Sequence, residues 1–97
     1  MKTIWKFSLS LEQLGGNSNP TIRVPKGAVI VHVANQGGDL TLWGIVDDKA
    51  ETVDASILIV GTGHELPDDA GQYLGTGHFR NDALVLHVFS RDLKRVK

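Results

Sequence analysis

Apolar and polar residues alternate along this chain in short runs, and residues that favour turns separate the runs. From Thr3 to Leu11 the alternation is strict, which is typical of an amphipathic strand. Residues 28–35 are apolar on both faces, as in a central strand. Apolar residues do not recur at helical spacing over any length. The pattern predicts an all-β domain of about seven short antiparallel strands, forming a small sandwich or an open barrel.

Turn residues set the expected limits of these strands. Gly37-Gly38 suits a two-residue hairpin turn, and Gly44, inside a strand, indicates a bulge or a close approach by another group. Strands are expected over residues 3–11, 21–24, 28–35, 39–47, 56–60, 72–79 and 83–90. We expect a helical turn over 11–14, a loop over 15–20, and a loop or helical turn over 47–54. The expected core consists of Trp5, Phe7, Val31, Val33, Leu42, Ile57, Ile59, Leu84 and Leu86.

Length and charge narrow the class of protein. Ninety-seven residues suffice for one core, so residues 1–90 are expected to form a single β domain, followed by a basic tail over 91–97. The net charge of −1 provides no general attraction to nucleic acids or anionic membranes. The chain has no cysteine, which excludes disulfides and thiolate zinc sites. No apolar run approaches the ~20 residues of a membrane helix, and we expect a cytoplasmic protein.

One tetrapeptide occurs twice, fourteen residues apart, and is the first candidate for a binding site. Glycine allows the backbone to adopt positive φ or to approach another group closely, and threonine and histidine add polar groups that can bind an anion. The alternative is that both copies are β-bulges or hairpin bends. The candidate ligand-binding residues are Gly61, Thr62, Gly63 and His64 of the first copy, Gly75, Thr76, Gly77 and His78 of the second, and Arg80.

Evidence for catalysis is weaker. The four histidines are His32, His64, His78 and His87. With a carboxylate such as Glu65 or Asp69 they could hold zinc or iron, but no local pair has the spacing of a metal site. No serine lies in a strand–turn–helix elbow, and no carboxylate pair has surroundings that suggest acid–base chemistry. We therefore expect no catalytic residues, no metal and no cofactor.

Charge is distributed unevenly along the chain. Residues 47–69 carry seven acidic side chains and one lysine, a net charge of −6, whereas the tail 91–97 carries a net charge of +3. These segments could be solubilising loops and a frayed terminus, or they could be surfaces for a partner or for a second copy. Because a sheet of this size leaves edges that need protection, we expect a homo-oligomer.

Several blocks of the sequence resemble a known family. MKTIWKF, VPKGAVIVHV, LTLWGIVD, ILIVGTGH, YLGT and LVLHVF, between Met1 and Phe89, are similar to a family of small bacteriophage and prophage domains without an assigned function. That family has GTGH once and only GT after the tyrosine, so Gly77 and His78 depart from it. The resemblance implies a phage origin and no particular chemistry.

The sequence as a whole favours a protein that acts by binding. We expect a non-enzymatic phage accessory protein, active against host defence, that sequesters a small phosphate-bearing ligand such as a nucleotide immune signal. The alternative is an inhibitor that covers a host defence protein with the acidic face 47–69. A metal-dependent enzyme comes third, and a role as a minor virion or scaffold component also stays open.

Overall fold

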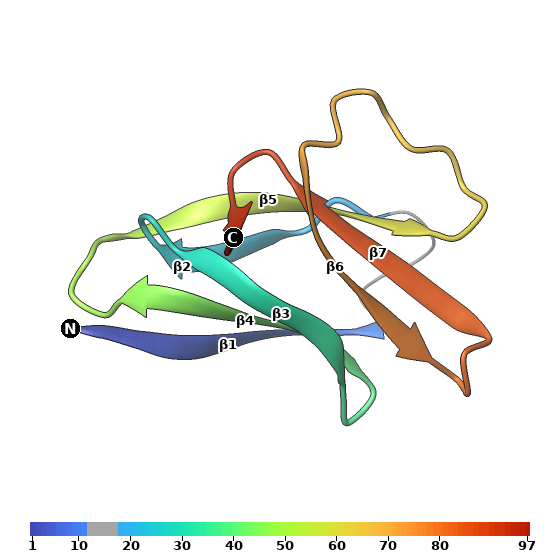
Figure 1. The fold of residues 1–97 in the computed structure, drawn as a ribbon, viewed down its shortest axis with the longest axis horizontal. Coiled ribbons are helices and arrows are strands. Elements are labelled where there is room, and N and C mark those ends of the chain that lie inside the picture. The colour runs from blue at the N-terminus through green and yellow to red at the C-terminus, as the bar shows by residue number, and fades with distance from the viewer. Residues whose placement is uncertain (12–17) are drawn as a thin grey trace.

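The computed structural model describes residues 1–11 and 18–97, and these residues form a two-layer β-sandwich (Figure 1). The eight strands in the described residues are β1 Lys2–Ser10, β2 Thr21–Pro25, β3 Val29–Gln36, β4 Asp39–Asp47, β5 Thr52–Gly61, β6 Gln72–Phe79, β7 Leu84–Ser90 and β8 Lys94–Arg95. One sheet has the order β1-β4-β3-β8 and the other the order β2-β5-β7-β6. The expected all-β class is confirmed, as an open sandwich.

Most neighbouring strands are antiparallel, and the short β8 is parallel to β3. β7 lies between β5 and β6 and is antiparallel to both, so β5 and β6 run in the same direction. The connection over residues 62–71 must therefore return along the length of the sheet before β6 begins. In Figure 1 this connection bulges away from the sandwich.

The hairpin between β3 and β4 follows from two glycines. Gly37 and Gly38 have φ of 61° and 92°, and two successive positive values define the primed turn that matches the twist of paired strands. The Asn35 side chain accepts a hydrogen bond from the Gly38 amide at 2.9 Å. The hairpin expected from the Gly-Gly pair is confirmed.

A bulge in β3 changes which of its residues face the core. The pairing with β4 shifts between Ile30 and His32, so Val31 is the extra residue. Ile30 and Val33 are buried whereas Val31 is only partly covered, so the prediction of Val31 as a core residue was wrong. The close approach expected at Gly44 is found here, because a Cβ there would lie 3.3 Å from Ile30 Cδ1.

Trp5 is not a core residue, contrary to prediction. Its side chain is 38% exposed, while Phe7 and Leu9, further along the same strand, pack against the core. β1 is an edge strand with β4 as its single neighbour, so less of its surface is shielded than alternation alone suggests. Among the other predicted core residues, Phe7 and Leu84 are partly buried, and Val33, Leu42, Ile57, Ile59 and Leu86 are buried.

Two further segments differ from the expected limits. β5 begins at Thr52, so the expected loop over 47–54 holds only for its first part, the turn before Thr52. Leu93 is 4% exposed, and the Val96 amide donates to the Ile30 carbonyl at 2.8 Å, which ties the basic segment 91–97 to the first sheet. The helical turn expected over 11–14 and the loop over 15–20 fall largely on residues 12–17, outside the described residues.

Candidate functional site

The first copy of the repeated tetrapeptide forms the turn that ends β5. Gly61 is the last residue of the strand, and its carbonyl accepts a hydrogen bond from the His64 amide at 3.1 Å. Gly63 has φ of 87°, a left-handed conformation that glycine adopts at little cost. The Thr62 amide donates to the Val85 carbonyl at 3.3 Å and so attaches the turn to β7.

The second copy lies inside β6 and forms no turn. Its glycines face the opposite sheet: a Cβ on Gly75 would lie 2.6 Å from Val33 Cβ, and one on Gly77 would lie 3.1 Å from Leu40 Cδ1. These two glycines are explained by close packing of the two sheets. Both copies therefore contain glycine for conformational or packing reasons, and the reasons differ.

The threonines of the two copies converge on one histidine. Thr62 Oγ1 lies 2.8 Å from His87 Nε2, and Thr76 Oγ1 lies 3.1 Å from His87 Nδ1. The Tyr73 hydroxyl extends this chain of hydrogen bonds by pairing with Thr76 Oγ1. From the sequence, His87 was considered only as one of four possible metal ligands. The strand register that places it opposite Thr76 is set by the tertiary fold.

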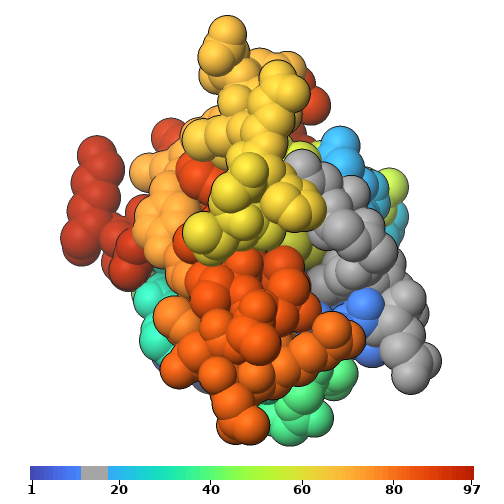
Figure 2. Space-filling model, turned by 90° about the vertical axis from the view of Figure 1, so that its right-hand side faces the viewer, coloured from blue at the N-terminus to red at the C-terminus, as the bar shows by residue number. Residues whose placement is uncertain are grey.

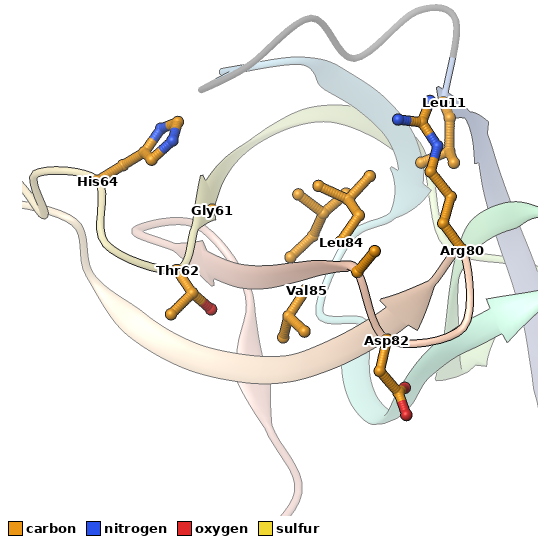
Figure 3. A pocket seen from close by; sticks show the side chains of 10 residues that line it. Leu11, Gly61, Thr62, His64, Arg80, Asp82, Leu84 and Val85 are labelled. Atoms are coloured by element: carbon orange, nitrogen blue, oxygen red, sulfur yellow. The ribbon is translucent and has the colours of Figure 1, made fainter.

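A cavity of about 690 Å³ opens between the first copy and the β6–β7 hairpin. The cavity is lined by Leu11, Gly61, Thr62, His64, Arg80, Asp82, Ala83, Leu84, Val85 and Leu86. Figure 2 shows its two walls, the start of the 62–71 connection in yellow and the hairpin with early β7 in orange, next to each other on one face. In Figure 3, His64 stands at one end and Arg80 at the other, with Leu84 between them.

Of the nine candidate residues, Gly61, Thr62, His64 and Arg80 line this cavity. The side chains of the second copy do not line it. Thr76 reaches it only indirectly, through His87, and Nδ1 of the exposed His78 pairs with Asp82 Oδ1 at 3.3 Å. The structure thus joins the first copy with Arg80 and leaves the second copy outside.

Arg80 is presented by an unusual hairpin. Arg80, Asn81 and Asp82 have φ of 52°, 54° and 68°, and the Ala83 amide donates to the Arg80 carbonyl at 3.0 Å. Asparagine and aspartate tolerate this left-handed region, whereas arginine has no local compensation for it. Figure 3 shows the side chains of Arg80 and Asp82 extending in opposite directions. Within the described residues Arg80 has no ion pair.

The acidic segment 47–69 is largely compensated by nearby cations. Five of its seven carboxylates lie opposite a positive group: Asp47 and Asp48 opposite the Met1 ammonium, Glu51 opposite Lys26, Asp54 opposite Arg23, and Asp69 opposite Arg91. The Lys49 amide, which donates to Asp47 at 3.0 Å, lowers the pKa of that carboxyl. The Met1 ammonium donates a hydrogen bond to Asp48, which raises the pKa of that ammonium group. This pairing favours the interpretation of the segment as solubilising turns.

Residues 1–11 and 18–97 were compared with the requirements of a metal site and of a membrane-spanning helix. No group of three histidine, cysteine or acidic side chains in these ranges could hold a metal ion. The same ranges contain no helix long and apolar enough to cross a membrane.

These features define the chain as a β-sandwich domain with a cavity that has His64 at one end, Arg80 and Asp82 at the other, and mainly apolar side chains between them. The chain belongs to the family described as a domain of unknown function (DUF7352), which matches residues 1–97. Comparisons with curated proteins and with solved structures found no significant match. The expected relation to a family without an assigned function is confirmed, and the phage origin stays a prediction.

Proposed function

We propose that this domain binds a small organic anion in the cavity between the turn 61–64 and the β6–β7 hairpin. The observation that carries the proposal is the placement of Arg80 and His64 at opposite ends of an apolar floor. A guanidinium and an imidazole suit phosphate oxygens, and the leucine side chains between them suit a flat or apolar group. A nucleotide combines both kinds of group.

The size and strain of the site support this proposal. A volume of about 690 Å³ is within the ~300–1,000 Å³ typical of small-ligand pockets. The left-handed conformation of Arg80 costs of order 1–2 kcal/mol, and such strain is typical of residues whose placement serves binding. An arginine is a poor choice for that position on grounds of stability, and a useful one for holding an anion.

The resemblance to phage domains supports a proposal for the biological role. We propose a non-enzymatic phage accessory protein of the bacterial cytoplasm, which counters host defence by sequestering a nucleotide immune signal.

The test is Arg80→Gly, measured by calorimetric titration with a panel of mononucleotides and cyclic dinucleotides. Loss of a charge-assisted hydrogen bond of ~1.5–3 kcal/mol should weaken binding about tenfold to a hundredfold. Because glycine removes the left-handed strain, the melting temperature should stay the same or rise. Arg80→Lys should keep part of the affinity, since it keeps the charge.

A matched pair of histidine variants locates the ligand. His64→Ala should weaken binding because His64 lines the cavity, whereas His78→Ala should leave affinity unchanged because His78 lies outside it. If wild-type protein binds no member of the panel, or if Arg80→Gly and His64→Ala both bind as tightly as wild type, the proposed site is wrong.

A further inference from the structure

Exposed apolar side chains gather at the start of the chain. Among residues 1–11 and 18–97, the large hydrophobic residues with exposed side chains are Met1, Ile4, Trp5, Leu66, Tyr73 and Val96. Half of them lie on or next to β1, and Ile4 and Trp5 are 58% and 38% exposed. Since successive residues of a strand point to opposite faces, this edge strand has an uncovered apolar side chain on each face of its sheet.

β1 is also the least protected of the sheet edges in the described residues. It pairs with β4 without interruption from Lys2 to Ser10 and contains no glycine or proline. β2 has five residues and ends in Pro25, and β8 has two residues. β6 has a bulge before Gly75, and the Asn35 side chain donates to its His78 carbonyl at 3.0 Å. Bulges, prolines and short length protect an edge, and β1 lacks all three, so its remaining protection is the charge of Lys2 and Lys6.

We propose that β1 pairs antiparallel with β1 of a second copy, with the Trp5 residues opposite each other on the two-fold axis. The two four-stranded sheets then form one continuous eight-stranded sheet. In such a symmetric pair the facing residues share a face of the sheet. Trp5 faces the partner's Trp5, Ile4 faces the partner's Lys6, and Thr3 faces the partner's Phe7.

Charge selects this register over the two adjacent ones. The charged side chains of β1 are Lys2 and Lys6. A pair centred on Ile4 would place Lys2 opposite Lys6 twice, and a pair centred on Lys6 would place two lysines directly opposite each other. Like charges directly opposite are unfavourable across strands. Centring on Trp5 avoids both arrangements and covers the exposed apolar side chains of the strand, Ile4 and Trp5.

The first test compares two substitutions at Ile4 by sedimentation equilibrium of the whole chain. Ile4→Lys places two lysine pairs across the interface and should weaken the dimer roughly tenfold or more. Ile4→Glu places the new carboxylate opposite Lys6 and should preserve or strengthen it. Leu66→Lys, an equally drastic change at an exposed loop residue, should have no effect. Circular dichroism checks that each variant is folded.

The second test reads the register directly, because the chain has no cysteine of its own. Under mild oxidation Trp5→Cys should form a disulfide-linked dimer, since residues directly opposite in antiparallel strands are close enough for that bond. Thr3→Cys should not, because each new thiol would face the partner's Phe7. A monomeric mass at tens of micromolar, a dimer unaffected by Ile4→Lys, or stronger cross-linking from position 4 or 6 than from position 5 would overturn the proposal. None of the cavity residues belongs to β1, so these outcomes do not depend on ligand binding.

Discussion

His87 is the residue at which the polar groups of the second sheet meet. Each ring nitrogen faces a threonine hydroxyl, at 2.8 Å for Nε2 and 3.1 Å for Nδ1. A neutral imidazole donates from one nitrogen and accepts at the other, and a hydroxyl can do either, so both tautomers are satisfied. The imidazole thereby fixes Thr62, at the mouth of the cavity, to the centre of the sheet.

We predict that His87→Ala destabilises the domain. The hydroxyls of Thr62 and Thr76 each lose one hydrogen bond. Thr76 keeps its bond to Tyr73 and the exposed Thr62 can bond to water, so the expected cost is the ~0.5–1.5 kcal/mol of a net hydrogen bond for each. His78→Ala is the matched control, because it removes a strand histidine whose single ion pair is exposed on both sides and is worth ~0–1 kcal/mol. Urea unfolding measures both. Equal losses of stability would show that the hydrogen bonds of His87 contribute nothing special.

The strand β6 shows how one motif serves different purposes in different elements. In the first copy Gly63 allows the chain to turn after β5, and in the second copy the glycines of β6 allow two sheets to approach. The contact of β6 with β3 is close enough that a methyl group at Gly75 would overlap Val33. The two copies of the motif thus have the same residues but lie in different structural environments.

This contrast makes a prediction about glycine substitutions. Gly75→Ala should destabilise the domain by ~1–3 kcal/mol, because the new Cβ would lie 2.6 Å from Val33 Cβ and the sheets must separate. Gly61→Ala should be tolerated, since the nearest atom to its Cβ would be in the flexible His64 side chain at 3.6 Å. Thermal melts compare the two. If Gly61→Ala were the more harmful, the packing role assigned to Gly75 would be wrong.

At the scale of the whole molecule, the C-terminal segment helps to close the sandwich. Leu93 belongs to the core cluster, and the Ser90 hydroxyl links the segment to β5 by donating to the Ser56 carbonyl at 2.8 Å. The same hydroxyl accepts from the amides of Asp92 and Leu93 at 3.0 and 2.9 Å. The basic residues of the tail are therefore carried on a segment that is part of the fold.

We expect Leu93→Ala to cost ~2–5 kcal/mol, the usual range for a leucine removed from a core. Val96→Ala, in the same segment but with a side chain 44% exposed, should change stability by less than about 0.5 kcal/mol. Chemical unfolding of both variants gives the comparison. A small effect of Leu93→Ala would mean that the tail packs loosely and that the core closes without it.

The sequence by itself determined the features that depend on neighbouring residues. Alternation of apolar side chains predicted the all-β class, and the Gly37-Gly38 pair predicted the hairpin, because turn chemistry and strand periodicity act within a few residues. Part of the cavity lining was predicted from the sequence, because the first glycine-rich copy and Arg80 were both candidates on chemical grounds.

Only the tertiary structure decided the rest. The meeting of Thr62, Thr76 and His87 depends on the register of β6 against β7 and on the path of the connection before β6, neither of which is encoded locally. The bulge in β3 places Val31 outside the core, and the position of β1 at the edge of its sheet leaves Trp5 partly exposed. Periodicity states which residues share a face. Strand order, bulges and register decide what that face meets, because these arise from contacts between segments far apart in the chain.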